Sequence, residues 1–304
     1  MRSKFSKYTA RYQLAISVNI LAKIKIPVRI LRARIIRGVG RLASRKSIWH
    51  LKTVLIVAPH PDDEAFGVGG LIASMGIKAE ATGSSSQVHV LFLTSGGRSH
   101  AGCCDIPIRD LEARREAVAL RATHILGVEQ GNIYFFRLDD GGLPQPGTSG
   151  FSEVVDRIAS LLLKLKPDSV FVPHPLEGWS DHEAAEHLVR NAIVALAEPR
   201  YGQSANGHRK VTLYHYCVWF WFSMPLKKMW MVKWRQAITI ELKGPVSDSP
   251  MTGTSRTPHQ TKLAAMNAYL EDSCPCGRPS CGVLPEELLR ALKWERELFF
   301  RVDR

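Results

Sequence analysis

The sequence predicts an α/β protein, a Rossmann-like three-layer sandwich with a mostly parallel sheet and a functional site at the carboxyl ends of the strands. Short apolar runs alternate along the chain with longer, helix-compatible stretches, which is the pattern of strand–helix–strand units. Each of these apolar runs stops at a polar or acidic loop. Because ligands bind at this edge of an open α/β sheet, these loops are where function is expected.

Four buried strands are expected, and each is followed by a helix. The strand-like runs occupy residues 54–57, 87–94, 133–138 and 169–172. The helix-compatible stretches follow at residues 64–81, 107–126, 151–165 and 180–197. Alternation of this type implies parallel pairing, so the four polar loops should lie along one edge of one sheet.

The loop after the first strand carries the strongest functional signal. His60 and Asp63 are three residues apart across a tight strand-to-helix turn, so an imidazole and a carboxylate can converge on a divalent ion such as Zn²⁺. Asp62 would then be a carboxylate beside the metal. The alternative is a plain helix start, in which Pro61 opens the helix and the acids complement its dipole. That alternative leaves His60 unexplained.

The loop after the fourth strand offers a third ligand. Ser180 and Glu183 have the spacing of a capping box, which would place Asp181 and His182 in the first helical turn, with His182 directed at the crevice. The alternative is a solvated histidine. Residues 182–187 do not form the zinc-binding helix motif with two histidines four residues apart, because Glu186 stands where the second histidine is needed.

Charge is distributed unevenly over the 304 residues, which suffice for one large α/β domain or two small ones. Residues 1–50 hold 13 of the 41 Lys and Arg residues and no acid, so the remaining 28 basic residues balance the 28 acids. We therefore divide the chain into a basic N-terminal segment, residues 1–48, and one domain, residues 49–304. A neutral domain argues against a nucleic-acid-binding face.

The basic segment has the pattern of an amphipathic helix. Its apolar positions recur at helical spacing and are Val28, Leu31, Ile35, Val39 and Leu42, while Arg32 interrupts the stripe. Such a helix over residues 1–45 can bind an anionic membrane surface. The alternatives are a helix packed on its own domain, a disordered tail or an organellar transit peptide. A bilayer-spanning run of about 20 apolar residues is absent from the sequence, so the expected location is cytoplasmic, with a peripheral position on the inner membrane face left open.

Cysteines and aromatic residues are concentrated near the carboxyl end. Cys274, Cys276 and Cys281 lie in a Gly- and Pro-rich stretch, and free thiols are favoured there over a structural zinc because a fourth ligand is not obvious. Residues 214–234 contain eight Tyr, Trp and Phe side chains. Core aromatics are the favoured interpretation, and a platform for sugar rings or a lipid tail is the alternative.

At this point the residues resemble a known family, the PIG-L/LmbE-like zinc-dependent N-deacetylases. The resemblance rests on residues 58–64 (Ala-Pro-His-Pro-Asp-Asp-Glu), a Thr-Ser-Gly-Gly turn at residues 94–97, an arginine-bearing helix ending at residues 126–128 and the Asp-His pair at residues 181–182. It implies hydrolysis of an N-acyl group on an amino sugar or its conjugate. It also implies one Zn²⁺ per chain, or another divalent ion, held by His60, Asp63 and His182, with Asp62 as the general base.

The resemblance also assigns substrate-binding positions, and it has one departure. Ser95, Gly96 and either Arg114 or Arg115 correspond to the turn and the arginine helix, with the register between the two arginines left open.

The family's motif has a histidine where this chain has Trp179. Trp179 is therefore expected to contact substrate, with His174 replacing the missing proton donor and Asp181 orienting a neighbouring group. The alternative is a catalytically silent carbohydrate-binding or assembly protein on the same fold. A nucleotide-binding protein is disfavoured, since the first strand is not followed by a Gly-x-Gly-x-x-Gly motif.

Overall fold

A computed structural model describes residues 28–42, 45–46, 51–82, 86–101, 104–196, 198, 211–243, 247–248 and 255–302. In these ranges the chain forms an eight-stranded, mostly parallel sheet in the order β1-β7-β10-β6-β5-β2-β3-β4. The strands are β1 (Arg45–Lys46), β2 (Thr53–Ala58), β3 (Gln87–Thr94), β4 (Ile133–Leu138), β5 (Ser169–Pro173), β6 (Thr212–Tyr216), β7 (Ala237–Glu241) and β10 (Arg296–Val302). The predicted α/β class is confirmed, and the first four predicted strands agree with β2 to β5 to within a residue.

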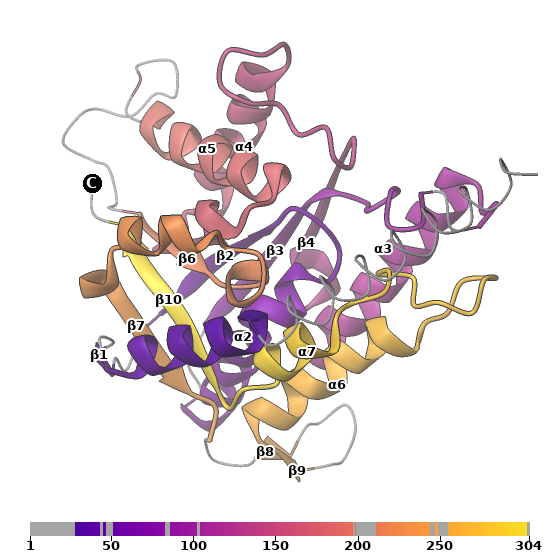
Figure 1. The fold of residues 1–304 in the computed structure, drawn as a ribbon. Helices are drawn as coiled ribbons and strands as arrows, with labels where there is room; N and C mark the ends of the chain where they lie inside the picture. The colour runs from indigo at the N-terminus through magenta and orange to yellow at the C-terminus, as the bar shows by residue number, and fades with distance from the viewer. Residues whose placement is uncertain are drawn as a thin grey trace, which may run out of the picture.

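Helices cover both faces of the sheet, as Figure 1 shows. One face carries α2 (Asp63–Thr82), α3 (Ile108–Ile125) and α6 (Pro258–Glu271), and the other carries α4 (Phe151–Leu165) and α5 (Ser180–Ala195). A short helix, α7 (Glu286–Leu292), lies near the first group. Each face has its own hydrophobic core, which gives the three-layer arrangement that the alternating pattern predicts.

The parallel strands deliver their loops to one edge. β2 pairs in parallel with β3 and β5, β3 with β4, and β5 with β6, so the carboxyl ends of all five strands meet there. β10 then pairs antiparallel with β6 and β7, which extends the sheet beyond β6 on the side opposite β5. The first strand of the sequence pattern, β2, is therefore central, and the loops on either side of it can approach the turn that follows it.

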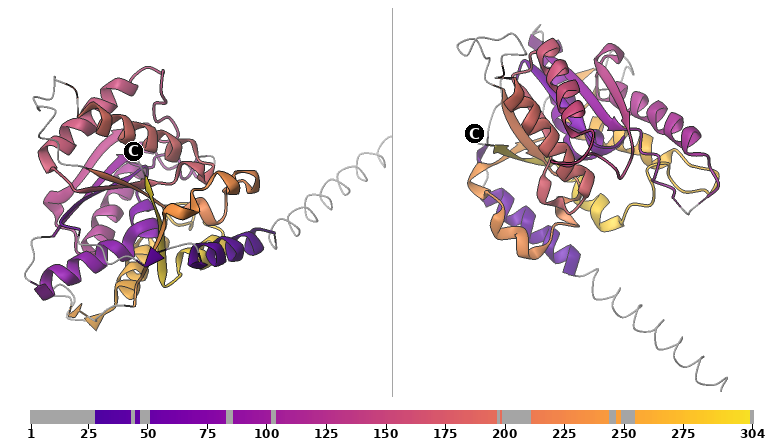
Figure 2. Two further views of the ribbon diagram at one scale, coloured as in Figure 1. Left: turned by 90° about the vertical axis from the view of Figure 1, so that its left-hand side faces the viewer. Right: turned by 90° about the horizontal axis from the view of Figure 1, so that it is seen from above.

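The basic N-terminal segment is helical over residues 28–42, and residues 1–27 lie outside the described ranges. This helix packs on the domain through Ala33 and Ile36, and the Arg32 guanidinium donates a hydrogen bond to the Met224 carbonyl at 2.9 Å. Its predicted apolar stripe faces outward instead, with Leu31 58% exposed. Both views in Figure 2 show the helix beside the segment that follows β6. Among the helices of the described ranges, none is long and apolar enough to cross a bilayer.

The aromatic segment after β6 is mostly core. Tyr216, Phe220 and Trp221 are buried, in agreement with the favoured interpretation. Two of its tryptophans are exceptions, because Trp219 lines a pocket and Trp230 is 84% exposed.

Candidate metal centre and pocket

The turn after β2 is held in an unusual conformation by the start of α2. Asp62 has a φ of 123°, a region that non-glycine residues rarely adopt, and its carbonyl accepts hydrogen bonds from the amides of Ala65 and Phe66. Its own amide donates to Glu64 Oε2 at 3.0 Å, and Glu64 Oε1 accepts from the Tyr269 hydroxyl at 2.6 Å. Glu64 therefore connects the turn at Asp62 to Tyr269 of α6 and holds the turn in place. Capping alone does not require this arrangement.

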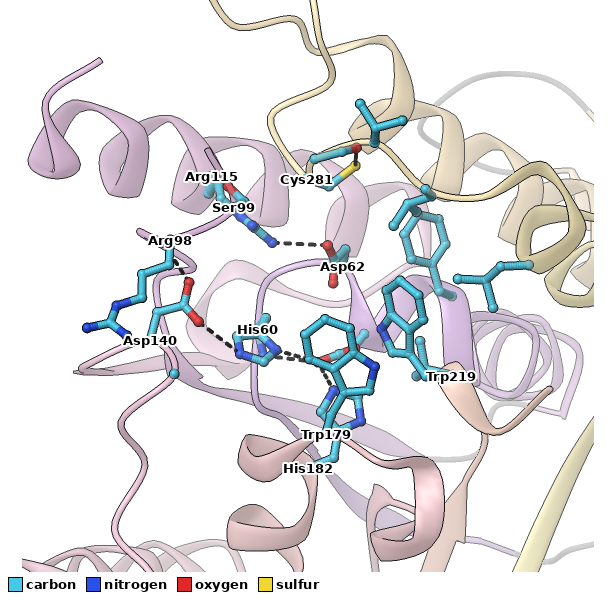
Figure 3. A pocket seen from close by; sticks show the side chains of 18 residues that line it. His60, Asp62, Arg98, Ser99, Arg115, Asp140, Trp179, His182, Trp219 and Cys281 are labelled. Atoms are coloured by element: carbon cyan, nitrogen blue, oxygen red, sulfur yellow. Dashed lines mark hydrogen bonds and ion pairs between the residues drawn. The ribbon is translucent and has the colours of Figure 1, made fainter. Parts of the chain in front are cut away.

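Three side chains from two loops converge beside this turn (Figure 3). Asp63 Oδ2 lies 3.3 Å from His60 Nδ1 and 3.5 Å from His182 Nε2. Ligand atoms of all three residues lie within 4.8 Å of one another, so they could hold one metal ion. The structure thus brings together the three residues that the sequence pattern and the family resemblance select.

Carboxylates also hold the far nitrogen of each histidine. His60 Nε2 lies 3.1 Å from both Asp140 and Asp181, and His182 Nδ1 lies 2.8 Å from Glu177 Oε2. Histidine ligands of metals are commonly oriented in this way, because the outer N–H donates to a carboxylate and leaves the inner nitrogen's lone pair for the ion. The donor set, two imidazoles and one carboxylate with an open position, fits zinc.

The electrostatics of the cluster favour a cation between these groups. Burial would lower the pKa of His182, but Asp63 and Glu177 outweigh it and raise the pKa to about 9. Burial likewise opposes ionisation of Asp63, yet the two histidines hold its pKa well below the usual range. Buried carboxylates here are stabilised by positive charge, which protons or a metal ion can supply.

Asp62 is beside the cluster and is paired with an arginine from α3. Its Oδ2 accepts a hydrogen bond from Arg115 Nη2 at 3.0 Å. Arg115 is buried and also donates to the carbonyls of Pro61 and Gly96, the second at 3.3 Å. Gly96 has a φ of +70°, and a Cβ there would lie 2.5 Å from the guanidinium, so this turn requires glycine. Burial raises the pKa of Asp62 to about 7, although Arg115 opposes this.

The two adjacent arginines have different partners and only one of them lines the pocket. Arg114 Nε donates to Asp272 Oδ2 at 2.7 Å and lies outside the pocket, whereas Arg115 lines it. Ser95 Oγ donates to Glu116 at 2.6 Å, and Ser95 is not among the lining residues. Of the predicted substrate contacts, Arg115 and Trp179 face the pocket.

The candidate ligands His60, Asp63 and His182 line a pocket of about 420 Å³, within the range of small-molecule sites. Trp179 is 43% exposed and its ring lies 4.8 Å from that of Trp219. Together they form one wall. The opposite walls come from the loop after β3 and from the segment between α6 and α7; their lining residues are Arg98, Ser99, Cys281, Gly282, Val283 and Leu284.

Two expectations for the loop after β5 need correction. His174 is 5% exposed, its Nδ1 accepts from the Leu176 amide at 3.1 Å, and its ring packs on Phe220 and Phe300. It is not among the residues that line the pocket, so its placement does not suit a replacement proton donor.

The predicted capping box is also wrong. α5 begins at Ser180, its N-cap is Trp179, and the first helical bond runs from Glu183 N to Trp179 O, so Ser180 already lies inside the helix. His182 is still in the first turn, as the sequence predicted. The loss of the box therefore does not change the position of the candidate metal ligand His182.

Comparison with known proteins gives the family. The model of the PIG-L family, described as GlcNAc-PI de-N-acetylase, matches residues 55–193. The chain is also similar to the diacetylchitobiose deacetylase of Thermococcus kodakarensis, at 32% identity over 157 residues. Residues 55–193 of the chain match the PIG-L/LmbE-like deacetylase family. The match covers 51% of this chain and 54% of the Thermococcus protein, so the chain spans about half the length of that curated relative.

Solved structures share the fold of this PIG-L/LmbE-like chain at low sequence identity. The 4-carboxy-2-hydroxymuconate hydratase GalB of Pseudomonas putida KT2440 is 17% identical with a TM-score of 0.56, covering 83% of this chain and 97% of that chain. The zinc-inhibited form of the teicoplanin deacetylase Orf2 is 17% identical with a TM-score of 0.50, covering 82% and 97%. One of these enzymes is a hydratase, so the fold alone does not fix the reaction.

Sequence reasoning missed the residues that support the metal ligands. Glu177 and Asp140 lie in loops that were recognised as polar, but nothing local distinguishes them from solvated acids. Trp219 was noted only as one aromatic among many. The available signal was that Glu177 and His182 follow the same strand and that Asp140 and His60 follow two strands of one parallel sheet, because such loops meet at one sheet edge.

Proposed function

We propose that the chain is a metal-dependent N-deacetylase that hydrolyses the acetamido group of an N-acetylhexosamine conjugate, with residues 49–304 as the catalytic domain. The observation that carries the proposal is the pair of carboxylate-oriented histidines around Asp63, next to a separate, partly buried carboxylate, Asp62. This combination supplies a metal site and a proton acceptor in one pocket.

His60, Asp63 and His182 would hold zinc, or another divalent ion, at the floor of the pocket. Zinc bound there would polarise the amide carbonyl and make water nucleophilic at neutral pH. Asp62 takes the proton from the attacking water and returns it to the leaving amine, and Arg115 holds the Asp62 carboxylate in position. Asp181 is a positioning residue, because its Oδ2 contacts His60 Nε2 at 3.1 Å and accepts from the Gly141 amide at 2.7 Å.

Support for an amino-sugar substrate comes from the pocket and from the relatives. The Trp179–Trp219 wall offers two aromatic faces next to the metal cluster, and flat apolar faces of sugar rings pack on such side chains. The Thermococcus relative is named for a diacetylated sugar and Orf2 for teicoplanin. We propose a glycolipid, glycoconjugate or natural-product intermediate as the substrate class.

The test is metal content together with acetate release from a panel of N-acetylglucosamine conjugates. We expect about one metal ion at this centre per chain, and loss of acetate release after chelation that zinc restores. Asp62→Asn should lower kcat by about 10²- to 10⁴-fold with the metal retained. A matched control is Asp156→Asn on α4, outside the pocket lining. Acetate release that persists in Asp62→Asn would refute the assigned proton acceptor.

A catalytically silent carbohydrate-binding protein is the second candidate, favoured by Trp179. In the family pattern a histidine at this position assists the developing oxyanion, and losing one such donor typically costs about 10²- to 10³-fold in rate. Trp179→His separates the two functions. Acetate release that appears or rises by about this factor supports a slowed enzyme, whereas unchanged silence with retained sugar binding supports the binding protein.

We also propose that the helix over residues 28–42 binds an anionic membrane surface. Leu31 and Ile35 on this helix are exposed, as are Trp230 and Met231 in the adjoining segment. Basic side chains of both segments can meet lipid phosphates. The test is partition to phosphatidylserine-containing vesicles against pure phosphatidylcholine.

The variant for this test is Leu31→Ser with Ile35→Ser, and the control is Val194→Ser, an exposed apolar residue on α5. We expect the double variant to lose most vesicle binding and the control to keep it. Equal binding of all three proteins would refute membrane contact through this helix.

A further inference from the structure

A second group of metal-ligating side chains lies outside the His60 centre. Ligand atoms of His100, Cys104 and Cys276 all lie within 4.8 Å of one another. His100 Nδ1 is 3.7 Å from Cys104 Sγ and 3.5 Å from Cys276 Sγ. These residues come from two loops that are 176 residues apart in the chain, between His100 and Cys276.

The histidine is already oriented as a ligand. His100 is 3% exposed, and its Nε2 lies 2.7 Å from the Pro279 carbonyl. A carbonyl can only accept, so Nε2 carries the hydrogen and Nδ1 presents its lone pair to the two sulfurs. A buried imidazole whose far nitrogen donates to the backbone is the arrangement that fixes the tautomer of a metal ligand.

A third cysteine, Cys274, lies on the same turn as Cys276 and outside the group of three. Cys274 is buried, its amide donates to the Arg278 carbonyl at 2.8 Å, and its carbonyl accepts from the Gly277 amide at 2.8 Å, which folds residues 274–278 into a tight turn.

We propose that His100, Cys104 and Cys276 bind a structural zinc ion at a site separate from the His60 centre, and that Cys274, on the same turn as Cys276, is the residue that completes the ligand set. Thiolate and imidazole donors suit Zn²⁺, and a closed set of four protein ligands is typical of a structural site. Sequence spacing favoured free thiols because Cys274, Cys276 and Cys281 alone lacked a fourth ligand. The fold supplies His100 and Cys104 from the loop after β3.

The site would fix two walls of the catalytic pocket. Ser99, next to His100, lines the pocket and its Oγ donates to the Ser280 carbonyl at 2.8 Å. Cys281 and Gly282, next in sequence to the thiol-bearing turn, line the same pocket. A metal bridging the two loops therefore braces the rim opposite Trp179. It has no contact with the proposed reacting groups.

The experiment is cobalt and zinc loading of the full chain, because the two centres differ in sulfur. Cobalt in a thiolate site gives an intense near-ultraviolet charge-transfer band, and the sulfur-free His60 centre gives none. X-ray absorption spectroscopy at the zinc edge should show Zn–S distances of about 2.3 Å. We expect the band in wild type and in His182→Ala, and its loss in Cys276→Ser and Cys104→Ser together with one bound equivalent of zinc.

Cys217→Ala is the matched control, since it removes a buried thiol elsewhere and should keep the band. Absence of the band in folded wild-type protein would overturn the proposal, as would a Cys104–Cys276 disulfide in protein purified without oxidant. Because wild type alone decides the outcome, a variant that fails to fold does not affect it. Failure of acetate release with the band present would refute the proposed deacetylase and leave this site standing.

Discussion

Glu177 Oε2 lies 2.8 Å from His182 Nδ1, and this contact leaves Nε2 of the same ring facing Asp63. Glu177 is in turn held by the amides of Val218 and Trp219, at 2.7 and 3.1 Å. The loop after β6 therefore orients a ligand that belongs to α5. Metal affinity should depend on Glu177 although it is not a ligand itself.

Glu177→Gln tests this dependence. We expect zinc affinity at the His60 centre to fall by about 10- to 100-fold, the usual effect of losing a carboxylate that orients a histidine ligand. Competitive titration with a chelator measures it, and Glu183→Gln, an exposed acid on α5, is the control. Equal affinities in the two variants would show that the His182 ring is oriented by packing alone.

The two adjacent arginines of α3 should differ sharply in their contribution to stability. Arg115 is buried and donates to Asp62 and two carbonyls, so Arg115→Ala leaves the partly buried Asp62 carboxylate and both carbonyls without this partner and should cost about 3–5 kcal/mol. Arg114 pairs with Asp272 at a partly exposed position, where the loss should stay below about 1 kcal/mol. Urea unfolding of both variants measures the difference, and coincident midpoints would contradict it.

The wall of the pocket should act on substrate binding. Trp179→Ala removes the exposed half of the Trp179–Trp219 pair, so KM for an N-acetylglucosamine conjugate should rise by about tenfold, roughly 1.4 kcal/mol, while kcat changes little. Trp230→Ala is the control, because that tryptophan is more exposed and lies outside the pocket. A fall in kcat with unchanged KM would instead give Trp179 a role in the transition state.

The central half of the fold could be predicted from sequence because its signals are local. Residues 54–57 and 169–172 are short apolar runs that end at polar loops, and in a chain that alternates such runs with helices they indicate buried parallel strands. β7 and β10 were not predicted, since their pairing is antiparallel and joins residues far apart in the chain. Sequence composition does not reveal which of these distant segments pair with each other.

Within the site, the convergence of the candidate ligands could be predicted from sequence, and the residues that contact them could not. His60 and Asp63 are three residues apart, so their convergence is a local property of the turn. The partners of Arg114 and Arg115 lie at distant sequence positions, Asp272 and Asp62, and periodicity cannot choose between them. The cluster of His100, Cys104 and Cys276 was missed for the same reason, because His100 and Cys276 are 176 residues apart in the chain.

The glycines of α2 illustrate packing that only the fold shows. A Cβ on Gly67 would lie 2.4 Å from Tyr216, and one on Gly70 would lie 2.4 Å from Leu242, so Gly67→Ala and Gly70→Ala should each destabilise by about 1–3 kcal/mol. Near Gly76 the nearest atom is 4.0 Å away, and Gly76→Ala should stabilise by up to about 1 kcal/mol. Thermal unfolding distinguishes them, and three equal shifts would contradict this packing.

Cys281 should be unreactive although it lines the catalytic pocket. Burial raises the pKa of its thiol to about 12, and the nearby Asp62 carboxylate adds to this while Arg115 opposes it. Only the thiolate reacts with iodoacetamide, so at pH 8 Cys281 should remain unmodified in the folded protein, and its alkylation should rise only as the pH approaches the raised pKa. Peptide mapping after a timed pulse measures this.

In metal-depleted protein, the partly exposed Cys104 and Cys276 serve as the internal comparison, because reagent can reach both. We expect them to be alkylated first and Cys281 to follow only after unfolding. Zinc added before the pulse should protect Cys104 and Cys276 without changing Cys281. Rapid alkylation of Cys281 at pH 8 would show that the pocket stabilises its thiolate, and the pocket wall would then carry a nucleophile.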